Sequence, residues 1–256
     1  MFRVLRIVVL LLILATVAQE AWLARSRATE WKDALRVAIY PINGDGGAAA
    51  AAYVQGLPPN AYAAIERFFA EEAARHGLEN TRPLTVRLAP PVASLPPQPP
   101  RNGGRFDNVR WSLQMRWWAW RHDDVPGMTP QVRLFVLFFD PATHSQLPHS
   151  VGVERGLIGV INAFASRDQT GSNMVIIAHE LLHTVGATDK YEFGTNLPRY
   201  PDGYAEPDRN PLYPQTFAEI MGGRIPVSET RAEIPESLGY TVIGDATATE
   251  IGWAKQ

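Results

Sequence analysis

Residues 173–191 read N-M-V-I-I-A-H-E-L-L-H-T-V-G-A-T-D-K-Y, and this stretch decides the fold. Before Gly186 it is apolar almost all round, which is the pattern of a helix buried in the centre of a domain. His179 and His183 are four residues apart, so on a helix they project from one face, about one turn from each other. The stretch therefore predicts two imidazoles inside a core, close enough to bind one metal ion.

The residues after these histidines offer a third ligand and a catalytic group. Gly186 can take the left-handed conformation that ends a helix, so the chain can turn back beneath the site and carry Asp189 to the metal. Zinc is the natural candidate, since catalytic zinc sites have three protein ligands and one open position. Glu180 lies about 100° round the helix from His179, too far to be a ligand yet near enough to reach a water on the metal. We expect Glu180 to be the general base.

The full pattern, H-E-x-x-H-x-x-G-x-x-D, resembles the motif of the metzincin metalloproteases, and its aspartate form is most similar to the snapalysin-type group. In that group a tyrosine follows two positions after the aspartate, as Tyr191 does here, and a turn with methionine comes later, as in E-I-M-G-G at residues 219–223. The resemblance implies an α+β, zincin-like domain in which helices pack on a twisted mixed β-sheet. It also implies that the active-site helix carries HExxH and that Met221 lies under the zinc.

This chain departs from the family at one position. Several metzincins carry tyrosine two residues after the methionine, where this chain has Gly223, so the resemblance leaves Tyr191 as the tyrosine near the scissile carbonyl. A short HExxH match also arises by chance in helices that hold no metal. Against that alternative, a buried Glu180 beside two buried histidines would be costly without a metal to compensate them.

Composition limits the other possibilities. With 256 residues and 46% hydrophobic content, the chain is large enough for one well-buried domain. Its formal net charge of -2 argues against nucleic acid as a partner. It has no cysteine, which excludes disulfides, thiolate zinc sites and a cysteine-based latency switch.

The first residues are typical of a secretory signal or a signal anchor, because Arg3 and Arg6 precede an uncharged run over residues 7–19. The run is shorter than the roughly 20 residues that span a bilayer. Ala18 ends a passable cleavage site, whereas Trp22 would anchor an uncleaved helix at the interface. Both readings stay open, as does a helix that remains in the cytoplasm. We expect a signal peptide or anchor over residues 1–24, a linker over 25–33 and a metzincin-like domain over 34–256.

Periodicity predicts the remaining elements. Strands are expected at residues 36–40, 84–88, 132–139 and 157–164, with Pro41 ending the first. The resemblance to the metzincins implies that the last of these is the edge strand that lines the active-site cleft. Helices are expected from Asn60 to Gly77, from 108 to 122 after Asp107, and over 247–253, with loops at 44–52 and 90–104. The tryptophans of 108–122 are expected to pack against the sheet.

We therefore expect a zinc-dependent endopeptidase at the extracytoplasmic face of the cell envelope, either membrane-anchored or secreted. Its substrate would be a peptide or protein, attacked by a zinc-bound water that Glu180 activates. One alternative is a hydrolase of other amides in the cell envelope. Another is a membrane-anchored binding protein with a structural zinc, although structural sites are closed and need no base.

The positive residues before the apolar run predict that the chain after about residue 25 lies outside the cytoplasm. A phosphatase that is active only after export, fused to the C-terminus, should therefore be active in cells. An intact but inactive fusion would place the domain in the cytoplasm.

Overall fold

The computed structural model describes residue 6 and residues 30–100, 104–147, 151–153 and 157–254. The predicted signal segment at 1–24, apart from residue 6, and the first part of the predicted linker at 25–33 lie outside the described residues. Within the described ranges, no helix has both the length and the apolar character needed to cross a membrane.

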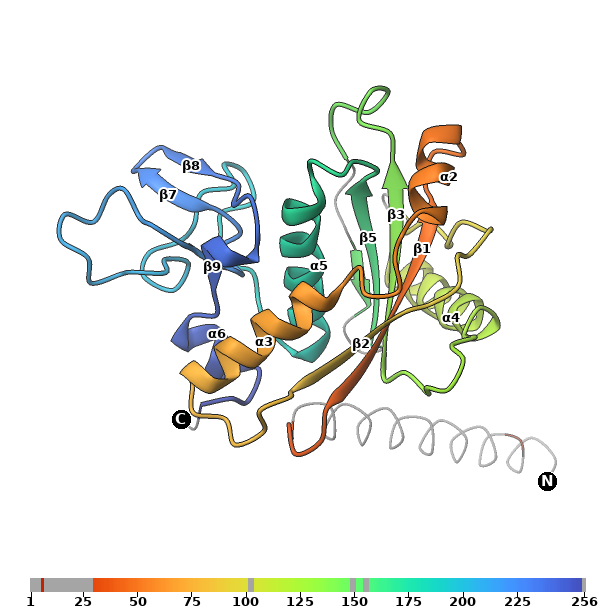
Figure 1. Ribbon diagram of the computed structural model, residues 1–256, viewed down its shortest axis with the longest axis horizontal. Coiled ribbons are helices and arrows are strands. Elements are labelled where there is room, and N and C mark those ends of the chain that lie inside the picture. Colours follow the sequence, from red (N-terminus) through yellow and green to blue (C-terminus); the bar gives the residue numbers. More distant parts are fainter. Residues whose placement is uncertain (1–5, 7–29, 101–103, 148–150, 154–156, 255–256) are drawn as a thin grey trace.

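Five strands form one sheet in the order β2-β1-β3-β5-β4 (Figure 1). The parallel strands are β1 (Leu35–Asn43), β2 (Leu84–Leu88), β3 (Val132–Phe139) and β5 (Ile158–Phe164), whereas β4 (Val151–Val153) runs antiparallel to β5. The nearly continuous apolar run of β3 is typical of a central strand with both faces covered. Together with the helices, this mixed sheet confirms the α+β class.

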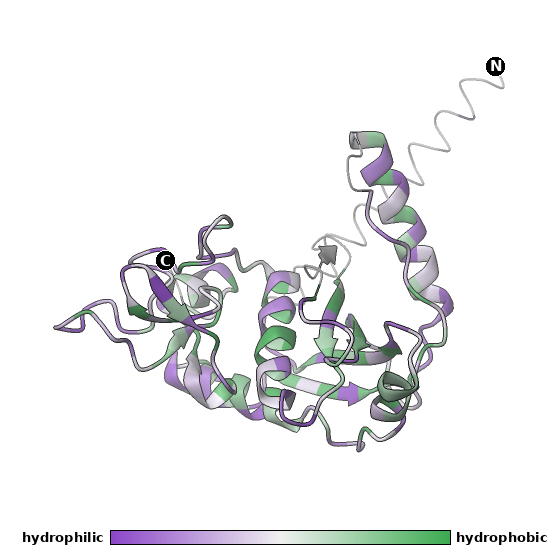
Figure 2. Ribbon diagram, turned by 90° about the horizontal axis from the view of Figure 1, so that it is seen from above, coloured by the Kyte–Doolittle hydropathy of each residue, from purple (hydrophilic) through white to green (hydrophobic). Residues whose placement is uncertain are grey.

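Alternate residues of the strands form two separate cores, because successive side chains point to opposite faces of a sheet. On one face, Leu134, Val136 and Phe138 pack with α3 (Ala63–Arg75) and α5 (Thr170–Val185). On the other face, Phe135 and Leu137 pack with α4 (Arg105–Arg121). Figure 1 shows α4 on the opposite side of the sheet from α3 and α5, and Figure 2 shows hydrophobic residues concentrated in the strands and in α5.

After α5 the chain forms a region of loops and short elements beside that helix (Figure 1). It contains the paired strands β6 (Ala218–Glu219) and β9 (Thr241–Val242), the hairpin of β7 (Ile225–Ser228) and β8 (Arg231–Glu233), and the short helices η2 (Leu238–Tyr240) and α6 (Asp245–Glu250). Trp31 ties this region to the start of the domain: its indole N–H donates to the Ile251 carbonyl at 2.6 Å, and its ring meets that of Trp253 edge-on.

Two predictions near the first strand were wrong. Strand β1 continues through Pro41 to Asn43. The nitrogen and the carbonyl of Pro41 face the same side of β1 as β2, but the pairing with β2 ends before Pro41, at Ile39 and Leu88. The missing N–H therefore removes no ladder bond. The predicted loop at 44–52 contains the helix α2 (Ala48–Gln55), since its alanine run has high helix propensity.

Helix boundaries were also misplaced. α3 begins at Ala63 rather than directly after Asn60. α4 begins at Arg105, where Asp107 is the third helical residue and its carboxylate accepts a hydrogen bond from the Gly104 N–H at 3.0 Å. The final helix ends at Glu250, before the predicted end at residue 253.

The prediction for the edge strand was wrong, and that for the tryptophans holds only in part. β5 is not the edge strand, because β4 pairs with its residues 158–160. Trp118 packs on Phe135, with ring centroids 4.7 Å apart, as expected of a helix covering a sheet. Trp117 and Trp120, however, are 58% and 73% exposed on the outer side of α4.

Candidate metal centre

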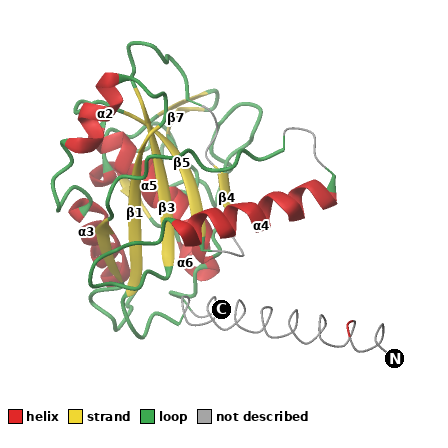
Figure 3. Cartoon of the chain, turned by 90° about the vertical axis from the view of Figure 1, so that its right-hand side faces the viewer, coloured by secondary structure: helices red, strands yellow, loops and turns green. Residues whose placement is uncertain are grey.

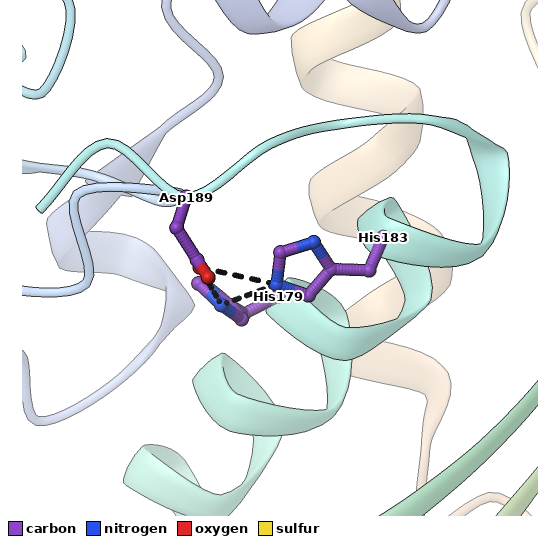
Figure 4. A group of neighbouring side chains, drawn as sticks. All are labelled: His179, His183 and Asp189. Atoms are coloured by element: carbon purple, nitrogen blue, oxygen red, sulfur yellow. Dashed lines mark hydrogen bonds and ion pairs between the residues drawn. The ribbon is translucent and has the colours of Figure 1, made fainter. Parts of the chain in front are cut away.

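Helix α5 places His179 and His183 on one face, as the sequence predicts (Figure 4). Each imidazole is oriented by a backbone carbonyl: Nδ1 of His179 lies 2.8 Å from the Ile220 oxygen, and Nδ1 of His183 lies 2.9 Å from the Ala187 oxygen. Because a carbonyl only accepts, each Nδ1 must carry a hydrogen. In the neutral rings, both Nε2 atoms then present lone pairs to one another at 3.1 Å.

Asp189 reaches the same point by the turn that the sequence predicts. Gly186 ends α5 in the left-handed conformation, with φ of 113°, and the Ala187 N–H donates back to the Leu182 carbonyl at 3.1 Å. The chain then reverses, and Oδ1 of Asp189 lies 3.2 Å from Nε2 of His179 and 3.1 Å from Nε2 of His183. Figure 4 shows the three side chains converging on one point.

The spacing of these three atoms fits a metal ion. Ligand atoms about 2.0–2.1 Å from an ion in a tetrahedral site lie roughly 3.3–3.4 Å from one another. The observed separations of 3.1–3.2 Å are close to that value. Oδ1 of Asp189 is buried, and when both rings are neutral with their hydrogen on Nδ1 it has no hydrogen-bond donor among the described residues. His179, His183 and Asp189 therefore form a group that can bind a metal ion.

Without a metal ion, a proton on one of these atoms would relieve part of the repulsion between them. Burial alone would lower the pKa of His183, but hydrogen bonds to Asp189 and to the Ala187 carbonyl raise it. Burial alone would raise the pKa of Asp189, but the two histidines hold it well below its usual range. One proton joins only two of the three atoms, whereas a metal ion contacts all of them.

The loop that carries Asp189 is held by its next residue. The buried ammonium of Lys190 donates to Glu250 at 2.8 Å and to the Thr188 carbonyl at 3.1 Å, and the Thr188 hydroxyl donates to the same Glu250 carboxylate at 2.7 Å. The Lys190 backbone N–H donates to the Met221 carbonyl at 2.9 Å. Asp189 is therefore fixed to both the last helix and the turn at Met221.

The turn at residues 219–223 lies against the metal group through the bond between Ile220 and His179. Met221 is fully buried in the main core. The fully buried carboxylate of Glu219 accepts hydrogen bonds from the Gly222 N–H at 2.8 Å, the Gly244 N–H at 3.1 Å and the Thr247 hydroxyl at 2.7 Å. Burial raises the pKa of Glu219, and these bonds oppose that rise.

His179 and Glu180 line a cleft of about 360 Å³. Glu180 makes no side-chain hydrogen bond to the described residues, and burial raises its pKa even though both histidines lower it. Tyr191 lies in the same cleft with its ring centroid 6.4 Å from that of His179. Burial and the nearby Asp189 and Glu180 carboxylates raise the pKa of Tyr191 to about 12, so its phenol stays protonated at neutral pH.

Sequence reasoning missed part of this site. Leu147, Asn162 and Arg224 also line the cleft, and they come from three separate segments with no shared local pattern. Glu219 was noted only as the residue before the predicted turn, although its position immediately before a buried aliphatic residue and methionine was a usable signal.

Comparison with known proteins adds no assignment. No family model matches this chain. No curated protein shows significant sequence similarity to it.

The purified chain should bind about one divalent metal ion, and His183→Ala should lose it, because two remaining ligands hold such an ion poorly. His144→Ala is the matched control, since His144 lies outside the metal group. Elemental analysis measures both. Equal metal content in the wild type and His183→Ala would contradict the site.

Glu219→Ala should destabilise the protein by about 3–5 kcal/mol, because three donors lose a fully buried carboxylate acceptor. Glu233→Ala, at an exposed carboxylate paired with Arg231, should change stability by under about 1 kcal/mol. Urea unfolding followed by circular dichroism compares the two. Similar values for both variants would show that Glu219 does not support the turn.

Proposed function

We propose that the chain is a zinc-dependent endopeptidase built on a zincin-like domain of the metzincin type. The observation that carries the proposal is the convergence of two imidazole nitrogens and one carboxylate oxygen beside a cleft, which is also lined by a glutamate that makes no side-chain hydrogen bond to the described residues. Two nitrogens and one oxygen, without thiolate, are a ligand set used by catalytic zinc. Zinc bound there would supply a Lewis acid that polarises the scissile carbonyl and makes water more acidic.

Glu180 has the position and the proton affinity for the base. Its carboxylate borders the cleft and burial raises its pKa, a direction that suits a group that accepts a proton from water and then donates it to the leaving amine. Tyr191, with a protonated phenol in the same cleft, is placed to donate a hydrogen bond to the substrate carbonyl.

The edge of the sheet supports a peptide as substrate. β4 is an edge strand, and the segment just before it contributes Leu147 to the cleft. An extended peptide can pair with free backbone groups at such an edge, and this holds a scissile bond without demanding particular side chains.

Two other functions compete with this proposal. A hydrolase of other amides in the cell envelope would use the same residues, and a screen of peptides and peptidoglycan fragments separates the two. A binding protein with a structural zinc is disfavoured by Glu180, because a closed structural site has no need for an unpaired carboxylate beside an open cleft. We place the domain on the extracytoplasmic side, anchored or secreted, from the charge pattern of the first residues.

Glu180→Gln tests the mechanism. The amide is nearly isosteric and leaves all three ligands in place, so the variant should keep its fold and its zinc. It should lose roughly 10²- to 10⁴-fold in rate, as is usual when a general base is removed. Zinc content and cleavage of casein are measured together.

Glu71→Gln, at an exposed position of α3, serves as the control and should cleave casein at the wild-type rate. Loss of zinc in Glu180→Gln would make Glu180 a ligand. Retained zinc with undiminished cleavage would refute its role as the base, and a wild type that cleaves none of the amides tested would favour a structural site.

A further inference from the structure

The outer face of α4 is apolar along its whole length. Its five large hydrophobic side chains are each between 58% and 92% exposed: Phe106, Val109, Leu113, Trp117 and Trp120. We call this set the α4 stripe. Exposed apolar surface of this extent on one element is uncommon and usually marks a binding surface.

The stripe is a single line along the helix. Its members are separated by three, four, four and three residues. At about 100° per residue they fall within an arc of roughly 80°. Met115, Trp118 and Ala119, which pack on the sheet, lie on the opposite side of the helix. α4 therefore has two apolar faces, and the sheet covers only one of them.

At about 100° per residue, Arg116 lies on one side of the stripe, and Arg110 and Arg121 lie on the other. α4 carries four arginines, at positions 105, 110, 116 and 121, against the single Asp107, so its formal charge is +3 in a chain whose net charge is -2. Asp107 is already engaged with the Gly104 N–H. The guanidinium of Arg121 lies over the ring of Trp117, 5.1 Å from its centroid. Aromatic and aliphatic residues flanked by arginine are typical of helices that lie in the headgroup region of a membrane.

The position of α4 leaves this face accessible. On the inner face Trp118 packs on Phe135 of the sheet, and two indoles bind the loop after β2: that of Trp118 donates to the Ser94 hydroxyl at 3.2 Å and that of Trp111 to the Pro97 carbonyl at 2.9 Å. Figure 3 shows α4 lying across the sheet and projecting beyond it past β4. Its 17 residues extend about 25 Å as a ridge. A flat bilayer surface meets a ridge along its whole length, whereas a protein partner would need a matching groove.

We propose that the α4 stripe binds the interfacial region of an anionic lipid bilayer, with its apolar side chains among the acyl chains and its arginines at the lipid phosphates. An apolar face of this kind sinks about 5–10 Å into the boundary between headgroups and chains. The apolar run at residues 7–19 independently predicts a chain that meets a membrane. The proposal uses neither the metal group nor the cleft, so its test is independent of the proposed enzyme activity.

The absence of natural cysteine allows a direct test on the full chain. Single cysteines are introduced at two positions of the stripe, Val109→Cys and Leu113→Cys, and at two exposed positions of α4 outside it, Asn108→Cys and Gln114→Cys. Each is labelled with a nitrobenzoxadiazole fluorophore. The label is then observed with and without vesicles of mixed phosphatidylglycerol and phosphatidylcholine that contain a nitroxide-labelled lipid.

Without vesicles, all four labels should report water. With vesicles, the labels at 109 and 113 should shift to the blue and be quenched several-fold more than those at 108 and 114. Vesicles of phosphatidylcholine alone, or high salt, should reduce the difference, because the arginines lose their anionic partners. Every variant keeps residues 7–19, so attachment through that segment affects the four positions alike.

Three results would overturn the proposal. Equal quenching at the four positions in the anionic vesicles would mean that α4 takes no fixed orientation there, and no quenching at 109 and 113 would mean that the stripe stays in water. Labels at 109 and 113 that are already shielded without lipid would show that another part of this chain, or a second copy, covers the stripe; size-exclusion chromatography distinguishes those two.

Discussion

Three acceptor atoms meet within 3.2 Å of one another in the centre of this protein, and much of the chain around them serves to keep them there. Such an arrangement is unfavourable without a positive charge between the atoms. The Nδ1 atoms are held by the carbonyls of Ile220 and Ala187, so neither ring can turn its lone pair away without losing a hydrogen bond. The backbone therefore holds the two Nε2 atoms and the Asp189 oxygen close together despite their repulsion. A metal ion is the simplest group that removes this repulsion.

The region after α5 supplies that rigidity. Glu219 joins the turn beneath His179 to Gly244 and Thr247, and Lys190 joins the loop beneath His183 to Glu250. Both carboxylates are thus bound at or beside α6, although Glu219 holds the turn that contacts His179 and Glu250 holds the loop that carries Asp189. A buried charge with one partner missing is strongly destabilising, so the loss of a partner of Glu219 or Lys190 should loosen the segment that it holds. The irregular loops of this region are therefore held by side-chain hydrogen bonds rather than by a regular strand ladder.

The sequence predicted the site better than the fold around it. The positions of His179 and His183 follow from helical spacing, and Gly186 adopts the conformation that its lack of a side chain permits. These are local effects, and local effects can be deduced from a single segment. Pro41 was misjudged because its tolerance depends on where β2 ends, which is a property of a distant strand. The cleft residues Leu147, Asn162 and Arg224 were missed for the same reason, since only the folded topology brings them together.

The prediction that the α4 tryptophans pack against the sheet was wrong in part for a different reason. Composition alone cannot distinguish an aromatic residue that packs on a sheet from one that faces outward, because both occur on the same helix two residues apart: Trp118 is buried and Trp120 is exposed. β3 divides its side chains in the same way, Phe135 towards α4 and Leu134 towards the core of α5. A surface bound to α4 is thus separated from the metal group by the full thickness of the sheet. Binding through α4 would fix the position and orientation of the cleft relative to the bound surface. The chemistry would still be determined by α5 and the loops that pack against it.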